Sequence, residues 1–312
     1  DELIATLRRG VEFRELQAQR SAATGGAMFK PGDIEGRLVG DSPQMKKVIQ
    51  QVRKLAVVRT PVLLVGENGT GKGSVAEILH GATGAGMAQF VRIDCSLSSE
   101  QSFRDGLLGK NGEGGPWVRE AKGGTLFLRH LQCLALPVQK ELVSVLRNTS
   151  HGFRLVCTTT EDLEKMVDEV QFNDELFYRV ASLPLHLPAL RDRKDDIPAL
   201  VKHFTTRATN PLVDTNLIEF TPDAMAVLAA YQWPGNLTEM FQLVSKIAST
   251  TETRVVTSEQ LPLRLREMKD WPTLTRFMEG QEKQYVDRVM NACRGDKAAA
   301  AKVLGIDVAK LG

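Results

Sequence analysis

Seven residues near the start of the chain, 66–72, have the types and the spacing to surround an anion. They follow the pattern G-x-x-x-x-G-K, with Gly66, Gly71 and Lys72 at its fixed positions. Glycines let the backbone N–H groups wrap closely around a phosphate, and the lysine ammonium attracts the outer phosphates. An apolar run at 62–65 precedes the loop and a helical pattern follows it, so the positive end of a helix adds to the attraction. The motif predicts a nucleotide pocket.

The predicted phosphate contacts come from the loop and the first residues of the helix. A glycine-rich turn that binds no ligand is the alternative, and the lysine and the flanking elements both disfavour it. The predicted nucleotide-binding residues are Gly66, Glu67, Asn68, Gly69, Thr70, Gly71, Lys72, Gly73 and Ser74.

Alternating strand-like and helical runs extend from Val39 to about Arg207. The runs of strand length are residues 62–65, 90–93, 125–128 and 155–158. This alternation predicts βαβ units and a parallel sheet, with a ligand at the carboxyl ends of the strands. The fold class is therefore α/β, and the loop at 66–72 follows one of these strands.

The second half of the chain changes to a wholly helical pattern between residues 221 and 263. Thr221 and Pro222 have the types expected at a helix start, and residues 233–236, Trp-Pro-Gly-Asn, form a break. A last helical segment begins near Thr275 and ends with small residues before Gly305. This pattern predicts the opening of a helix-turn-helix, and an ordinary helical hairpin is the alternative.

The composition limits the classes of protein and of partner that fit this chain. The 312 residues suffice for about two domains, and a charged fraction of 25% with a net charge of +2 favours no particular partner. The four cysteines are scattered, which indicates free thiols in a reducing cytoplasm and no cysteine metal site. No apolar run of 18 residues and no signal peptide are present, so we expect a cytoplasmic protein without a membrane partner.

Several motifs together resemble the bacterial enhancer-binding proteins, the AAA+ activators of sigma-54 RNA polymerase, in the NtrC-type response-regulator subgroup. The similarity covers about residues 36–312 and rests on segments in the family's order, at 38–43, 66–72, 123–128, 190–198 and 231–237. It implies that Val39, Gly40, Arg191 and Leu237 join the loop in binding nucleotide.

The resemblance also implies an architecture. An AAA+ core, with a parallel sheet in a three-layer α/β/α sandwich, is expected over residues 36–207, and a helical lid over 208–263. An all-α, Fis-like helix-turn-helix DNA-binding domain would begin within 275–312. Residues 1–22 would form a linker helix after a receiver domain, and their weak seam of Ile4, Leu7 and Val11 favours a dimer.

The family carries two acids where this chain has Arg129 and His130. That Walker B pair holds Mg²⁺ and polarises the attacking water. An arginine there repels the cation, since two unit charges about 4 Å apart interact by roughly 4 kcal/mol at an effective dielectric near 20. The resemblance therefore implies a degenerate Walker B strand and a site that holds Mg²⁺ poorly, with no other metal site.

Other differences from the family affect ATP hydrolysis and the remodelling of the polymerase that hydrolysis drives. Asn173 stands where the family carries an arginine finger, which leaves Arg179 as the candidate finger, and Thr238 replaces the second-sensor arginine. The Gly-Ala-Phe-Thr-Gly-Ala loop that contacts the polymerase is missing after Gly109, and Trp117 is expected to pack beneath the shortened loop.

The sequence therefore predicts a DNA-binding transcription regulator that binds ATP or ADP but hydrolyses it slowly or not at all, a pseudo-ATPase. It would act with a form of RNA polymerase other than the sigma-54 form, as a homodimer or a higher homo-oligomer. Two alternatives stay open. One is a working ATPase whose metal site is rescued by Asp94 or Glu120, and the other binds cyclic di-GMP through Arg37, Arg129 and Arg179.

Overall fold

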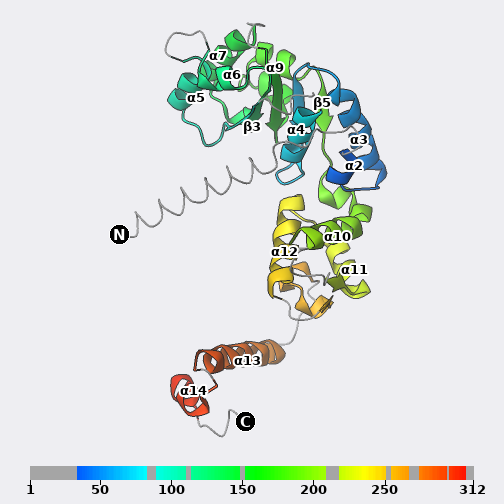
Figure 1. Ribbon diagram of the computed structural model, residues 1–312, viewed down its shortest axis with the longest axis vertical. Coiled ribbons are helices and arrows are strands. Elements are labelled where there is room, and N and C mark those ends of the chain that lie inside the picture. Colours follow the sequence, from blue (N-terminus) through cyan, green and yellow to red (C-terminus); the bar gives the residue numbers. More distant parts are fainter. Residues whose placement is uncertain are drawn as a thin grey trace. The chain divides into compact units, whose positions relative to one another are not determined.

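The computed structural model describes residues 34–82, 89–109, 114–147, 152–208, 218–250, 254–266, 274–293 and 295–306 (Figure 1). These residues form two compact units. The first contains the described residues up to Phe220 together with Leu228–Val255, and the second contains Thr221–Val227 and those from Val256 onward. The linker helix predicted over residues 1–22 lies outside the described residues.

A five-stranded parallel sheet forms the centre of the first unit. Its order is β2-β3-β4-β1-β5, from β1 (Val62–Val65), β2 (Phe90–Asp94), β3 (Thr125–Arg129), β4 (Arg154–Thr159) and β5 (Pro184–His186). The four predicted strands are confirmed, with small differences at their ends. The fifth was not predicted because it has three residues, begins with Pro184 and buries only Leu185, as suits a strand at the edge of a sheet.

Helices cover both faces of this sheet. Leu63 faces one apolar cluster, whereas its neighbours Val62 and Leu64 face the other, as the period of two in a strand requires. One face is covered by α2 (Ile34–Arg37), α3 (Pro43–Ala56) and α4 (Lys72–Gly81), and the other by α5 (Glu100–Leu107), α6 (Pro116–Glu120), α7 (Leu136–Arg147), α8 (Leu163–Asp168) and α9 (Asp174–Val180) (Figure 1). The predicted three-layer α/β/α arrangement is confirmed.

The following segment is mainly helical, with α10 (Ile197–Ala208), α11 (Pro222–Ala230) and α12 (Asn236–Thr250). The predicted helix start at Thr221 and Pro222 is confirmed, as is the break at 233–236. There Trp233 is fully buried and its indole N–H donates to Leu228 O at 2.8 Å. The prediction of a wholly helical segment was wrong in one detail, because the two-residue strand β7 (Val255–Val256) lies within it, and β6 (Glu219–Phe220) just before it.

Short 3₁₀ turns connect several of these elements, at Leu131–Cys133, Leu190–Asp192, Lys194–Asp196, Ser258–Gln260 and Leu263–Leu265.

Two helices near the carboxyl end of the second unit pack on each other, α13 (Leu274–Ala292) and α14 (Lys297–Leu304), through a small cluster that includes Val289 and Ala300. The Asp296 carboxylate caps α14 by accepting from two backbone N–H groups, and Gly305 ends the helix at a φ of 68°. The helix that would enter a DNA groove lies beyond the described residues, so the helix-turn-helix remains a prediction.

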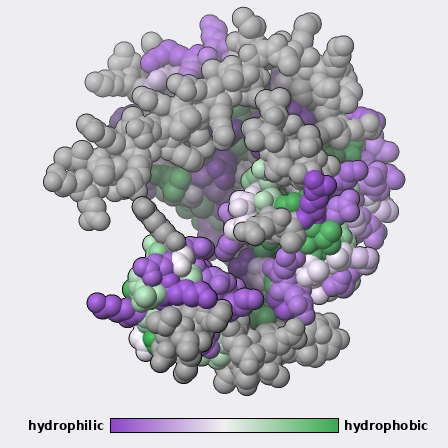
Figure 2. Space-filling model, turned by 60° about the horizontal axis from the view of Figure 1, so that its bottom comes forward, coloured by the Kyte–Doolittle hydropathy of each residue, from purple (hydrophilic) through white to green (hydrophobic). Residues whose placement is uncertain are grey.

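Figure 2 shows hydrophilic side chains over much of the described surface, with hydrophobic side chains in smaller patches between them. Among the described helices, none combines the length and the apolar character that spanning a membrane requires.

Candidate functional site

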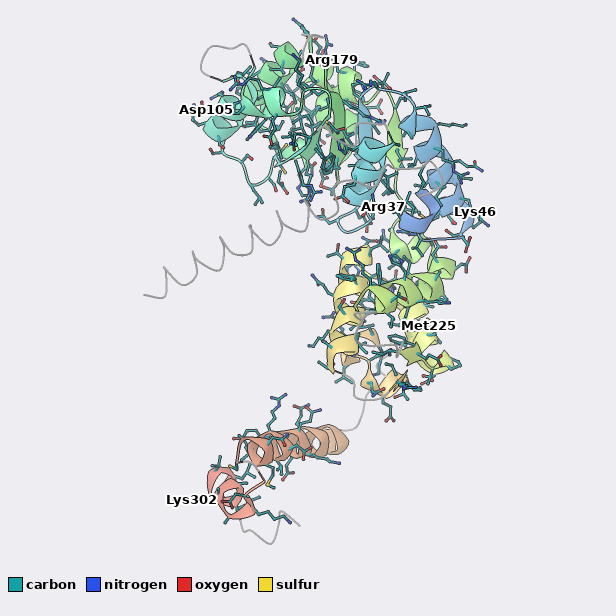
Figure 3. The ribbon with its side chains drawn as sticks, viewed as in Figure 1. Arg37, Lys46, Asp105, Arg179, Met225 and Lys302 are labelled. Atoms are coloured by element: carbon teal, nitrogen blue, oxygen red, sulfur yellow. The ribbon has the colours of Figure 1, made fainter. Side chains whose placement is uncertain are left out.

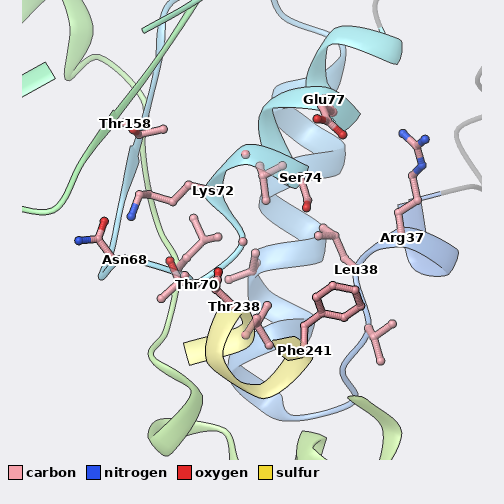
Figure 4. A pocket seen from close by; sticks show the side chains of 18 of the residues that line it. Arg37, Leu38, Asn68, Thr70, Lys72, Ser74, Glu77, Thr158, Thr238 and Phe241 are labelled. Carbon is pink, nitrogen blue, oxygen red and sulfur yellow. The ribbon is translucent and has the colours of Figure 1, made fainter. Parts of the chain in front are cut away.

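A cavity of about 430 Å³ lies where the loop after β1 meets the residues before α3, the carboxyl end of β3, and helices α10 and α12 (Figure 4). The predicted site residues that line it are Val39, Asn68, Gly69, Thr70, Gly71, Lys72, Gly73, Ser74, Leu237, Arg129 and His130. Those that do not line it are Gly40, Gly66, Glu67, Arg191 and Arg179.

The loop fits closely against the start of α12. The backbone N–H of Leu237 donates to Gly69 O at 3.0 Å. Gly69 has a φ of 78°, and a Cβ atom there would come 2.2 Å from Gly235 O. Gly71 has a φ of 101°, but its Cβ atom would meet only a Leu237 methyl at 3.4 Å. Gly69 is therefore required both for its positive φ and for the lack of a Cβ atom, whereas Gly71 is required only for its positive φ.

Three glycine-to-alanine variants should separate these reasons. Gly73→Ala should raise the free energy of unfolding by up to about 1 kcal/mol, because nothing lies within 4 Å of its Cβ position and alanine favours the helix α4. Gly71→Ala should cost about 1–2 kcal/mol through backbone strain alone, and Gly69→Ala about 3 kcal/mol because it also overlaps a backbone oxygen. Urea unfolding measures all three, and equal losses for Gly69→Ala and Gly71→Ala would contradict the described contact.

Lys72 is the cation of the loop. Its Nζ donates to Gly66 O and, at 2.7 Å, to Glu67 O, and its side chain is almost fully buried at 8% exposure. Burial lowers the pKa of Lys72 to about 8, the charge of Arg129 contributes in the same direction, and Glu67 opposes both. This ammonium is desolvated, so a phosphate that reaches it gains a charge-assisted hydrogen bond.

The lowered pKa predicts a pH dependence of phosphate binding. The affinity for ADP should fall about tenfold between pH 7 and pH 9, because Lys72 loses its proton near pH 8 in the free protein and the phosphates require the ammonium. Since the pKa of Lys72 in the folded protein lies below its ordinary value of 10.5, this group makes folding more favourable as the pH rises between the two. Calorimetric titrations across this range measure the affinity. Lys72→Arg, which does not titrate there, should give a flat profile, and a flat profile for the unsubstituted protein would contradict the assignment.

Glu67 belongs to a polar network that joins the loop to α12. Arg191 donates to both of its carboxylate oxygens, and Asn236 Nδ2 donates to Glu67 Oε2 at 3.1 Å and to Asn68 O at 2.9 Å. The Asn236 Oδ1 accepts from the backbone N–H of Leu190 at 2.8 Å. Hydrogen bonds from Arg191 and Asn236 lower the pKa of Glu67 to about 2. Glu67 and Arg191 therefore hold the shape of the loop from outside the cavity.

The carboxyl end of β3 carries a compact ionic cluster. Arg129 Nη1 lies 3.3 Å from Asp94 Oδ2, and His130 Nδ1 lies 3.0 Å from Asp94 Oδ1. Asp94 is the register partner of Arg129 on the neighbouring strand β2. Although burial raises the pKa of Asp94, hydrogen bonds from His130 and Ser96 outweigh it and hold the pKa below its usual range. His130 has a φ of 54°, and its backbone N–H donates to Thr158 Oγ1 at 3.1 Å.

Among the described residues, this end of the sheet offers no free carboxylate for Mg²⁺, which proteins usually hold through one or two carboxylates together with substrate phosphates. Both carboxylate oxygens of Asp94 are engaged by cationic or hydrogen-bonding partners, and Glu120 does not line the cavity. Glu77, the acid among the lining residues, pairs with Arg92. In the described ranges, no three His, Cys, Asp or Glu side chains gather as a metal site would require.

The arginine-finger candidate lies apart from the cavity. Arg179, on α9, pairs with Glu175 at 3.0 Å, and Asn173 caps the same helix by accepting from the backbone N–H of Leu176. Figure 3 shows Arg179 well away from Arg37. Of the three arginines considered for a cyclic dinucleotide, Arg37 and Arg129 line the cavity and Arg179 does not.

The sequence did not predict the residues of one wall of the cavity. Its residues come from α10 and the turn before it, with one residue of α12: Arg193, Leu200, His203, Phe204, Arg207 and Phe241. Phe241 contacts Phe204 edge-to-face, with ring centroids 5.5 Å apart, and Arg207 lies over the Phe241 ring at 5.3 Å. The spacing 200, 203, 204, 207 is that of one helix face, but the sequence does not say what that face adjoins.

Trp117 is half-buried and packs against α5. Its ring meets Phe103 edge-to-face, with centroids 5.5 Å apart, and a Cβ atom at Gly106 would lie 2.3 Å from the indole. The shortened loop itself, residues 110–113, lies outside the described residues.

Comparison with known proteins gives consistent matches. Residues 38–186 match the family described as "Sigma-54 interaction domain", and residues 191–275 match "AAA+ ATPase lid domain". The chain is 30% identical, over 332 aligned positions, to the alginate biosynthesis transcriptional regulatory protein AlgB of Pseudomonas syringae pv. tomato, covering 100% of this chain and 73% of the relative. It is 28% identical over 301 positions to the regulatory protein AtoC of Escherichia coli, covering 87% of this chain and 65% of AtoC.

Other relatives are matched over less of their length. With the Nif-specific regulatory protein of Rhodobacter capsulatus the identity is 32% over 253 positions, covering 75% of this chain and 43% of the relative. The chain thus spans between about two fifths and three quarters of these relatives.

Solved structures agree with the fold. Crystal structures of NtrX from Brucella abortus, in complex with ADP and with ATP, superpose with TM-scores of 0.66 and 0.65 at 26% and 27% identity. Each match covers 100% of this chain and 74% of NtrX. The predicted AAA+ core is confirmed.

Proposed function

The chain belongs to the family of sigma-54-dependent transcriptional activators, and we propose that it is a regulator that binds ATP or ADP without hydrolysing it efficiently. The observation that carries this proposal is the cluster at the end of β3. Arg129 and His130 occupy the place of the Walker B acids and engage both oxygens of Asp94, the nearby acid that was considered as a substitute. An acid held in this way is a poor ligand for a metal ion and a poor base for water.

Binding itself needs only groups that the cavity provides. The loop from Asn68 to Gly73 offers backbone N–H groups at the start of α4, and Lys72 supplies the positive charge. Arg129 lines the same cavity and adds a second cation on the phosphate side, where Mg²⁺ would otherwise balance the phosphate charge. The complexes of the similar protein NtrX with ADP and ATP support a nucleotide as the ligand.

The proposal extends to partners. The helices α13 and α14 support a DNA-binding end of Fis-like type, although the rest of that motif lies outside the described residues. The absence of the Gly-Ala-Phe-Thr-Gly-Ala sequence supports a regulator that does not remodel sigma-54 polymerase and acts with another form of the enzyme. We further propose a cytoplasmic homodimer, because Asn173 removes one contact on which ring assembly in this family depends.

A steady-state ATPase assay on the assembled protein tests the central point. Turnover should stay far below about one per second, the low end for working phosphoryl-transfer enzymes. Lys72→Ala is the control for contaminating activity, because it removes the loop cation. Turnover near one per second that disappears in Lys72→Ala would overturn the proposal. In parallel, calorimetry with cyclic di-GMP should give no heat, whereas ADP should give a binding isotherm.

A further inference from the structure

Arg193 is a buried cation whose guanidinium has no hydrogen-bond partner among the described residues. Its side chain is 3% exposed and lines the cavity. Within the part of the chain that the structure describes, no hydrogen bond or ion pair reaches its guanidinium, and its Nε is enclosed without an acceptor. Burial lowers the pKa of Arg193, and Asp196 opposes this only through its charge. A desolvated cation in this state costs stability unless something supplies acceptors.

Asp196, the acid whose charge acts on Arg193, makes no hydrogen bond to it and accepts from other donors instead. Asp196 Oδ1 accepts from the backbone N–H groups of Asp41 and Ser42, each at 2.7 Å, and Oδ2 accepts from Ser42 Oγ at 2.7 Å. These bonds fix the segment before α3, which forms part of the cavity wall. Since none of the described residues accepts from the Arg193 guanidinium, its donors are available to another group.

A second buried arginine, Arg154, also has an enclosed Nε without an acceptor, but both of its terminal nitrogens donate to the protein. Arg154 is 2% exposed and does not line the cavity. It donates to Leu79 O at 2.8 Å and to Leu55 O at 2.7 Å. Among the described residues, no carbonyl oxygen accepts from the terminal nitrogens of Arg193, so these donors are available to a molecule in the cavity.

The position of Arg193 indicates which part of that molecule it meets. It precedes α10, whose Leu200 and Phe204 continue the same wall, and Leu38 and Val48 also line the cavity. These apolar side chains suit a flat ring. Figure 4 shows Leu38 and Phe241 away from Lys72, which marks the phosphate side.

We infer that Arg193 recognises the base of the bound nucleotide, by donating a hydrogen bond to a ring nitrogen or carbonyl oxygen. A guanidinium can only donate, and purine rings present acceptors along their edges. This inference rests on the proposed function, since it requires a nucleotide in this cavity. Lys72 and Arg129 are placed to bind the phosphates, so the role left to Arg193 is recognition of the base.

The test uses the full chain, the variant Arg193→Met, and two probes that share a diphosphate: ADP and inorganic pyrophosphate. Calorimetry should show that the variant loses about 10- to 100-fold in ADP affinity, while its pyrophosphate affinity stays within about twofold. Without ligand, Arg193→Met should melt at the same temperature as the unsubstituted protein or higher, because no hydrogen bond is lost and a desolvated charge is removed.

Arg154→Met is the matched control, a buried arginine outside the cavity. It should lower the melting temperature, because two carbonyl groups lose their donors, and it should leave the ratio of ADP to pyrophosphate affinity unchanged.

The outcomes separate this inference from the function on which it rests. Equal losses for both probes in Arg193→Met would assign the side chain to the phosphates, and an unchanged ADP affinity would assign it to the fold alone. Either result overturns the inference while ADP binding by the unsubstituted protein keeps the proposed function. If the unsubstituted protein binds neither probe, the proposed function fails and the inference fails with it.

Discussion

Replacing Arg129 by Asp and His130 by Glu should make nucleotide binding depend on Mg²⁺. In the unsubstituted protein, the affinity for ADP should differ by less than about twofold between Mg²⁺ and EDTA, because the cluster with Asp94 offers no free carboxylate. The double variant removes one cation, adds two acids and releases Asp94. A single charge interaction near 4 Å is worth roughly 4 kcal/mol, and after desolvation we expect at least about a tenfold tightening by Mg²⁺.

Calorimetry with ADP in Mg²⁺ and in EDTA measures this difference. Arg147→Asp is the matched control, since Arg147 pairs with Glu175 and neither residue lines the cavity, and it should leave Mg²⁺ without effect. A tenfold tightening by Mg²⁺ in the unsubstituted protein would show that the site holds the ion as it stands, and would contradict the account of the cluster.

Lys72→Ala should weaken ADP and ATP binding by about 100-fold or more. The ammonium is the buried cation of the loop, and charge-assisted hydrogen bonds to phosphate are worth about 1.5–3 kcal/mol each. Lys72→Arg should bind with intermediate affinity, because it keeps the charge but its planar fork does not match the position of the ammonium.

Fluorescence or calorimetric titration measures these affinities. Lys46→Ala changes an exposed lysine on α3 that does not line this cavity (Figure 3), and it should leave the affinity unchanged. If Lys72→Ala and Lys46→Ala bind ADP equally well, the ligand does not depend on the loop.

The elements that carry the loop could be predicted because their signals are local. Residues 62–65 are apolar, glycines and a lysine follow at fixed spacing, and the structure has β1, the loop and α4 in that order. The strand β5 could not be predicted, since three residues beginning with Pro184 give no periodic signal.

The arrangement of the side chains around the cavity could not be predicted, because it depends on contacts between residues far apart in the sequence. That Arg129 meets Asp94 follows from the register of β2 and β3, and nothing in the sequence states which strands are neighbours. Arg191 and Arg193 are two residues apart, and nothing in the sequence distinguishes their positions. In the structure, however, Arg191 pairs with Glu67 outside the cavity, whereas Arg193 lines the cavity. Only the turn at Leu190–Asp192 and the partners around it decide which arginine faces the ligand.

The hydrogen bonds from Asn236 and Leu237 to the loop have a consequence for signalling. We expect a rearrangement of Asn68 or Gly69 on ligand entry to reach the first turn of α12 through these bonds, because the loop contacts that turn directly. Under the proposed function, the regulator responds to the fraction of its pockets that hold nucleotide, and so to the nucleotide concentration. Under that proposal the response requires no hydrolysis, and the dissociation constant sets the nucleotide concentration at which it occurs.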